Sequence, residues 1–147
     1  MMLEYGINKT ALRALIDEQV SQAADEAYGD NGMSLYDSIV LTEKDVSTVE
    51  SFIDTAAQSL SARLFDICKM RKEGTTNYLS FDVPDFDTTM EENVKSAITH
   101  YIVFYACIAI FQSRRAQAVP DYTARAQTAL DLAITLLKSR KAPTEPW

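Results

Sequence analysis

The spacing of apolar residues along the chain predicts four long helices. The first helix is expected from about Lys9 to Ala27, where apolar side chains recur every three or four residues and acidic or polar side chains occupy the other face. Asn8 or Thr10 is placed to cap its start. Residues 28–32, YGDNG, are turn formers that should end this helix.

A second helix is predicted after Leu41. Thr42 and Asp45 have the spacing of a capping box, and Leu41 precedes them as a hydrophobic staple. The apolar periodicity that follows continues through Cys68, and we expect the helix to end by residues 72–74.

The third predicted helix, from about Met90 to Ala116, contains the most apolar stretch of the chain. Residues 101–111, YIVFYACIAIF, carry no charge, and Gln112 and three polar residues follow them directly. Eleven residues reach only about 16 Å as a helix, roughly half of the hydrocarbon core of a bilayer. We therefore interpret the stretch as a buried core helix. Its start has two alternative capping pairs, Thr88 with Glu91 and Thr89 with Glu92.

The fourth helix is expected from Pro120 to about Arg140, because proline is favoured in the first turn and apolar residues then line one side. Between the helices, residues 78–83 partly alternate and predict a short strand before Pro84. Residues 33–41 read either as a second strand, which would make a hairpin with the first, or as an apolar lead-in to the next helix.

These elements predict an all-α fold: four main helices in a bundle around a central apolar helix, with a small two-stranded β element or extended loop. With 147 residues and 47% hydrophobic content, one domain spanning residues 1–147 is expected, with flexible ends at 1–8 and 142–147. No repeat, signal peptide or stretch of membrane-spanning length is visible, which favours a cytoplasmic site of synthesis and no membrane.

The chemistry-bearing residues favour a structural role. The net charge of −7 argues against specific DNA binding. The single histidine, His100, has no second histidine or nucleophile motif beside it, and Cys68 and Cys107 are expected to be buried thiols. Two acidic groups do not match a calcium loop, so neither a metal nor a cofactor is expected; they are Asp82, Asp85 and Asp87, and Asp25, Glu26, Asp30 and Asn31.

Two further groups of side chains allow more than one interpretation. Arg114 and Arg115, with Arg125 and Gln117, form a modest basic cluster that favours subunit contacts or a solvated face over phosphate binding. The aromatic residues of the third helix favour the core, with oligomerisation as the alternative; they are Tyr101, Phe104, Tyr105 and Phe111.

Three segments together resemble a known family. They are LTEKDVSTVESFIDTAAQSL, ITHYIVFYACIAIF and DYTARAQTALDLAITLLKSRKAP, and from about Val40 to Pro143 their order is similar to that of small helical head-tail connector proteins of tailed phages and Bacteroides prophages. The resemblance implies a non-enzymatic virion protein, assembled in the bacterial cytoplasm. It implies a ring of identical subunits below the portal, contacting portal and tail-side proteins and extending the channel through which DNA passes unbound.

The resemblance also implies a protruding loop or hairpin, which we place at residues 74–87 and expect to be mobile in the monomer. The residues assigned to the subunit interface are Tyr78, Leu79, Phe81, Val83, Arg114 and Arg115. The alternative function is a cytoplasmic helical protein-binding or regulatory module, dimeric, that captures a partner helix through its aromatic face.

Overall fold

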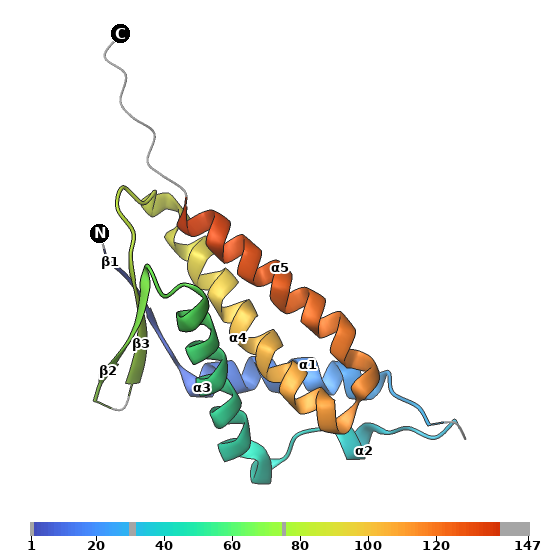
Figure 1. Cartoon of the computed structure of the whole chain (residues 1–147). Helices are drawn as coiled ribbons and strands as arrows, with labels where there is room; N and C mark the ends of the chain where they lie inside the picture. The colour runs from blue at the N-terminus through green and yellow to red at the C-terminus, as the bar shows by residue number, and fades with distance from the viewer. Residues whose placement is uncertain (1, 30–31, 75, 139–147) are drawn as a thin grey trace.

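The computed structural model describes residues 2–29, 32–74 and 76–138 (Figure 1). The chain is mostly helical, 68%, with four long helices and a small three-stranded antiparallel sheet. The four predicted helices are confirmed, whereas the predicted all-α class with a two-stranded β element is corrected to α+β. The elements are β1 (Met2–Gly6), α1 (Lys9–Asp25), α2 (Tyr36–Ile39), α3 (Val46–Arg63), β2 (Cys68–Glu73), β3 (Thr76–Asp82), α4 (Glu91–Arg114) and α5 (Val119–Leu137). Short 3₁₀ turns at Glu43–Asp45, Thr88–Met90 and Ala116–Ala118 precede α3, α4 and α5.

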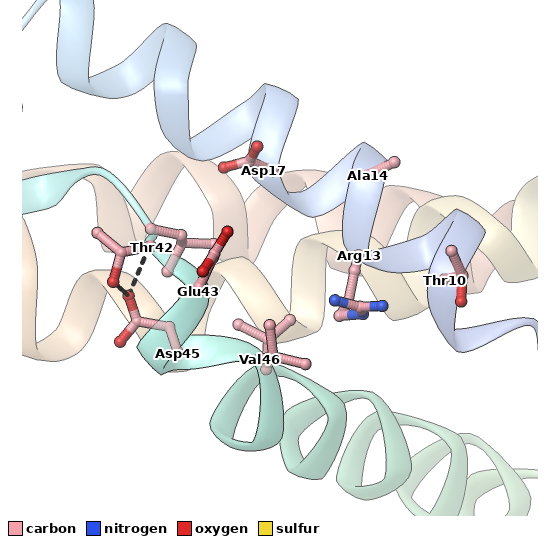
Figure 2. A pocket seen from close by; sticks show the side chains of 10 residues that line it. Thr10, Arg13, Ala14, Asp17, Thr42, Glu43, Asp45 and Val46 are labelled. Carbon is pink, nitrogen blue, oxygen red and sulfur yellow. Dashed lines mark hydrogen bonds between the residues drawn. The ribbon is translucent and has the colours of Figure 1, made fainter.

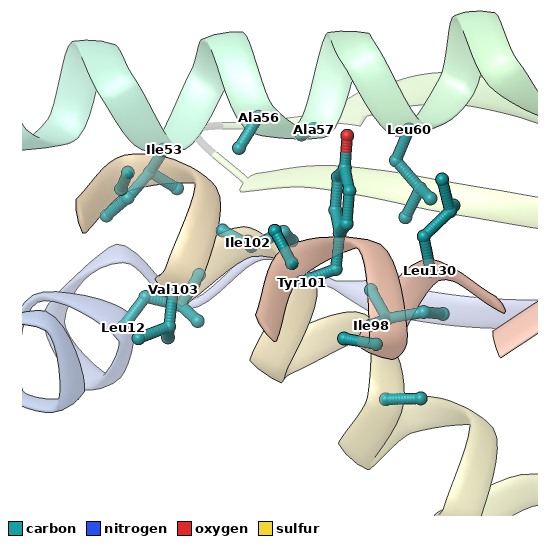
Figure 3. Close-up of a cluster of buried hydrophobic side chains, with 14 of the residues drawn as sticks. Leu12, Ile53, Ala56, Ala57, Leu60, Ile98, Tyr101, Ile102, Val103 and Leu130 are labelled. Atoms are coloured by element: carbon teal, nitrogen blue, oxygen red, sulfur yellow. The ribbon is translucent and has the colours of Figure 1, made fainter. Parts of the chain in front are cut away.

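Helix α4 is central, as its apolar sequence predicts. It packs antiparallel against α5 along most of its length, while α1 and α3 cover its other sides (Figure 1). Ile98, Ile102 and Phe111 have no exposed surface. Figure 3 shows Ile98, Tyr101 and Ile102 of α4 among side chains from α1, α3 and α5. A helix that is apolar on every side requires packing partners on every side, and these three helices provide them.

Two of the predicted helix starts, those at Asn8 and Thr42, are confirmed by their hydrogen bonds. Asn8 Oδ1 accepts from the Ala11 N–H at 3.1 Å and caps α1. The Thr42 N–H donates to Asp45 Oδ2 at 2.8 Å, which is the acidic half of the capping box. At α4 the arrangement differs from prediction, since Asp87 Oδ1 accepts from the Thr89 N–H and caps the preceding 3₁₀ turn.

The sheet accounts for most of the differences from the predicted fold. Its strand order is β1-β3-β2, both pairs antiparallel, with Leu3 and Cys68 on either side of Phe81. The strand predicted at residues 78–83 is confirmed as β3, whereas residues 33–41 do not pair with it and contain the short helix α2. The predicted hairpin between those two segments is therefore wrong.

Two segments expected to be irregular or helical are strands. Residues 2–6, predicted as part of a flexible end, form β1, because the apolar residues Leu3, Tyr5 and Ile7 alternate with Glu4 and Gly6 and all three are buried. The second predicted helix ends at Arg63 rather than near residue 72. The spacing of Leu60, Leu64, Ile67 and Cys68 imitates a helix, yet the N–H groups of Ile67 and Cys68 both donate to Leu64 O in a tight turn that leads into β2.

Candidate functional site

The residues predicted as a subunit interface in the hairpin are mostly core residues. Leu79, Phe81 and Val83 have exposed fractions of 2% or less, so the expectation that a single subunit leaves them partly uncovered is wrong. The reason is that β3 is the central strand and one of its faces packs on the helices. Tyr78 lies on the opposite face, half-buried, with the Arg71 guanidinium 4.6 Å from its ring centroid. It is the member of this group whose side chain reaches the outer face of the sheet.

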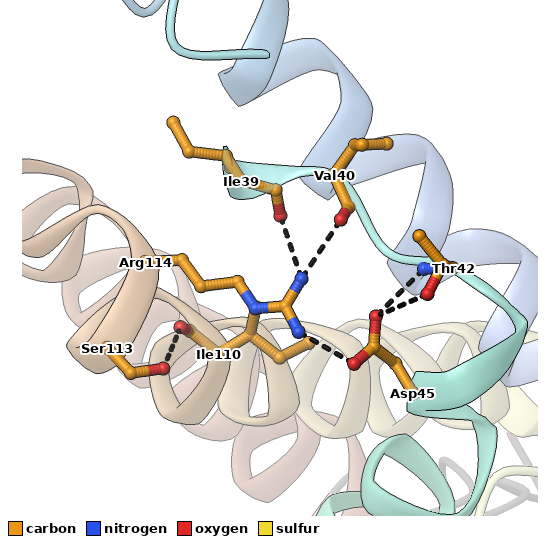
Figure 4. Close-up of polar contacts among 7 residues, drawn as sticks. All are labelled: Ile39, Val40, Thr42, Asp45, Ile110, Ser113 and Arg114. Carbon is orange, nitrogen blue, oxygen red and sulfur yellow. Dashed lines mark hydrogen bonds and ion pairs between the residues drawn. The ribbon is translucent and has the colours of Figure 1, made fainter. Parts of the chain in front are cut away.

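Arg114 and Arg115 bind the chain's own backbone. Arg114 Nη1 donates to Val40 O at 2.9 Å and to Ile39 O at 3.3 Å, and its Nη2 lies 2.7 Å from Asp45 Oδ1 (Figure 4). Thr42 and then Arg114 hold the pKa of Asp45 below its ordinary value, because their N–H groups donate to its carboxylate. The Arg115 guanidinium donates to Ala23 O at the end of α1.

The predicted basic cluster is therefore largely neutralised within the chain. Arg115, Gln117 and Arg125 do line one depression of about 240 Å³. Glu26 and Asp121 line it too, and Arg125 Nη2 lies 3.0 Å from Asp121 Oδ2. The depression thus has no clear excess of positive charge for a phosphate group.

The aromatic residues of α4 belong to the core, as the first interpretation expected. Tyr101 and Phe111 are buried and the other two are half-buried. The Tyr101 hydroxyl lies 3.0 Å from Ser59 Oγ, and Phe111 packs on Tyr122 with ring centroids 4.9 Å apart. An open aromatic face that captures a partner helix is therefore not present on α4. His100 is exposed and stacks on Phe104.

Of the two acidic groups, one member, Asp87, has a capping role in the structure. Asp87 caps the turn before α4, and Asp85 has a positive φ of 55°. Asp25 and Glu26 are exposed at the end of α1, while Asp30 and Asn31 lie outside the described residues. Within the described part of the chain, no group of three or more His, Cys, Asp or Glu side chains is arranged to hold a metal ion.

Both cysteines are buried free thiols, as expected. Burial raises the pKa of Cys107 from its ordinary value of 9.0 to about 12 and that of Cys68 to about 11. Because the thiolate is the reactive form, neither side chain is a nucleophile near neutral pH.

The apolar helix meets the length and hydropathy expected of a membrane span, contrary to our expectation from sequence. Thr88–Arg114 has 27 residues, and its most apolar 18-residue window has a mean hydropathy of 1.6. However, 56% of that window is buried inside the fold. The central helix of a packed bundle has the same composition, since its neighbours replace lipid as the apolar surroundings.

A groove of about 460 Å³ lies between the first half of α1 and the segment that leads into α3 (Figure 2). The apolar part of its lining, called the floor below, consists of Ala14, Leu41, Val46 and Val49. Its charged walls come from Arg13 and Asp17 on α1 and from Glu43 and Asp45 on the facing segment. The Arg114 network positions this segment, because it fixes the backbone at Ile39 and Val40 and the side chain of Asp45.

The charges of the groove are unequal after its internal ion pairs are assigned. Asp45 is paired with Arg114, and Arg13 Nε lies 3.5 Å from Glu50 Oε1, which is close enough for an ion pair but is not a hydrogen bond. Asp17 and Glu43 are exposed, and neither lies within ion-pair distance of a basic side chain among the described residues. The groove therefore combines an apolar floor with two unpaired carboxylates, one on each wall.

Sequence reasoning missed this groove. Arg13 and Asp17 are one turn apart on the polar face of α1, and Glu43 directly follows the capping residue Thr42, so neither position indicates a groove. The one feature of the sequence that points to an apolar contact here is Leu41, the hydrophobic staple residue before the capping box. The sequence does not show that α1 is the helix facing Leu41. Comparison of the chain with protein-family models, curated proteins and solved structures found no match.

Proposed function

We propose that the chain is a structural head-tail connector subunit of a tailed phage or prophage particle. In this proposal it forms a ring below the portal, contacts portal and tail-side proteins, and is assembled in the bacterial cytoplasm. The observation that carries the proposal is a small helical body with an attached β2–β3 hairpin (Figure 1). The outer strand of this hairpin, β2, is an edge strand of the sheet, and five of its six residues are exposed. The resembling family combines a helical core with such a projection.

The open sheet edges support assembly with further copies. β1 and β2 flank β3, so each has one edge without a strand partner in the described part of the chain. Open edges pair with other chains, and charged residues on them restrict which chains are accepted. Lys69 and Lys72 supply such charges on β2. We therefore place the hairpin's subunit contact on β2 and Tyr78, in place of the buried residues of β3.

The charge of the chain suits passage of DNA without binding. The sequence has 21 acidic and 14 basic side chains. An acidic channel wall repels phosphate groups, so DNA moves along it instead of being retained. The proposed role requires no catalysis.

A second candidate is a cytoplasmic protein-binding or regulatory module. It is favoured by the loop after α1, where Tyr28 and Met33 have exposed fractions of 65% and 67%. Large apolar side chains at such exposure are typical of contact surfaces. A connector uses contact surfaces as well, so this loop does not displace the first proposal.

The test is deletion of the gene from the phage or inducible prophage that encodes it. The proposal expects filled heads and free tails that do not join, and joined particles after the chain is supplied from a plasmid. The Tyr78→Asp variant should complement less well than Thr128→Asp, a matched change on the exposed side of α5. Infectious, normally joined particles in the deletion strain would contradict the connector function.

A further inference from the structure

The groove between α1 and the start of α3 has the properties of a site for a short basic and apolar segment. Asp17 comes from the α1 wall of the groove and Glu43 from the facing wall (Figure 2), and the apolar residues of the floor line the same groove. Two carboxylates that share a groove repel each other, and a ligand with two positive charges removes that repulsion. The floor favours small apolar or proline residues next to those charges.

One segment of this chain has that composition. Residues 139–147, SRKAPTEPW, lie outside the described residues, and their sequence places Arg140 and Lys141 directly before Ala142 and Pro143. The two basic residues equal the number of unpaired carboxylates in the groove. A proline in the segment also lowers the conformational entropy that is lost when it binds.

A chain's own segment does not reach its own groove. The groove lies at the Arg114 end of α4, because Arg114 pairs with Asp45 in the groove wall. α5 starts at that end and runs antiparallel to α4 for 19 residues, about 28 Å, so Leu137 lies at the opposite end (Figure 1). Arg140 and Lys141 follow Leu137 by three and four residues, which span at most about 14 Å. The groove must receive them from another copy.

We propose that the groove binds residues 140–143 of a neighbouring copy, with Arg140 and Lys141 paired to Asp17 and Glu43 and with Ala142 and Pro143 on the apolar floor. Such a contact joins two different surfaces of the same chain. It is therefore heterologous, the kind that closes into a ring when the rotation between copies permits. The inference deepens the proposed function and rests on it only for the identity of the ring.

A charge exchange in the full-length chain tests the contact, with self-association measured by sedimentation equilibrium at low salt. Asp17→Lys with Glu43→Lys, and separately Arg140→Glu with Lys141→Glu, should each weaken self-association about tenfold or more. The four changes together should restore it. Glu18→Lys with Glu92→Lys is the matched control, because both glutamates are exposed outside the groove and the net charge changes equally.

The combined variant decides between a specific contact and a general effect of charge. Each variant's melting temperature is compared with that of the unchanged chain, so that loss of folding is recognised. The contact is overturned if the chain remains monomeric at every concentration, if the groove variants associate like the control, or if the combined variant is not restored. The connector function is decided separately, by the joining of heads and tails in the deletion strain.

Discussion

At the scale of single residues, Arg114 makes the hydrogen bonds that connect the end of α4 to the segment before α3. Its guanidinium joins the end of α4 to the backbone at Ile39 and Val40 and to Asp45, and the side chains of the ion pair are only 27% and 21% exposed. Sequence reasoning assigned this arginine to a surface cluster. Its position after an apolar stretch does not reveal that two carbonyl groups from a loop some 75 residues earlier need a donor.

We predict that Arg114→Met lowers the free energy of unfolding by about 2–4 kcal/mol, since two carbonyl groups lose their side-chain donor and Asp45 loses its ion-pair partner in a part-buried place. Urea denaturation measures the change. Lys95→Met is the matched control: its ion pair with Glu91, at 3.3 Å, is more exposed and within one helix turn, so a loss of about 0.5 kcal/mol or less is expected. Equal losses in the two variants would show that the Arg114 network does not hold the segment.

Cys107 predicts a dependence of stability on alkaline pH. Burial raises its pKa to about 12, whereas in the unfolded chain the thiol ionises near its ordinary value of 9.0. The contribution of the neutral thiol to stability is thus complete below pH 9 and is lost as the pH rises from about 9 to 12. Urea denaturation between pH 8 and 11 should show a smaller decline for Cys107→Ala than for the unchanged chain. An identical decline would place Cys107 in contact with water.

At the scale of elements, α4 is defined by what surrounds it. Its sequence is apolar on all sides, and the structure shows which positions lie deepest: Ile102 has no exposed surface, while Ile108 is half-buried. The sequence alone ranks these two isoleucines equally, because both lie within the uncharged stretch. The distinction arises from the way α1, α3 and α5 divide the circumference of the helix among them.

We predict that Ile102→Asp lowers the free energy of unfolding by about 4 kcal/mol or more and that Ile108→Asp costs clearly less. A carboxylate at Ile102 has no route to water, whereas one at Ile108 is able to extend to the surface. Chemical denaturation of both variants provides the measurement. A larger loss at Ile108 than at Ile102 would mean that the packing around α4 is different from the one described.

The helix starts and the strand β3 were predictable from sequence, whereas the strands that pair with β3 were not, for physical reasons. Helix starts at Asn8 and Thr42 are signalled by nearby residues, since capping is a local interaction. β1 gains its stability from β3, some 75 residues away, so the alternation at Leu3 and Tyr5 has little meaning until that partner is known. The groove depends in the same way on tertiary packing of α1 against residues 41–49.

At the scale of the whole molecule, the chain presents three surfaces that its own fold leaves available. They are the open hairpin strand β2, the exposed loop after α1, and the groove with its two unpaired carboxylates. A subunit placed in a ring, with neighbours on both sides and partners above and below, uses surfaces on several sides of one body. This distribution is the structural basis for preferring a connector to a dimeric binding module.

The central claim is our proposal that the chain is a ring-forming connector subunit. A cryo-electron microscopy map of the neck of phage particles induced from the strain that encodes the chain tests this claim most directly. The account predicts a closed ring of this chain between the portal and the tail, with acidic side chains along the DNA channel and the β2–β3 hairpin against a neighbouring subunit. A neck whose density is fully accounted for by other chains, in particles that lack this one, would contradict it.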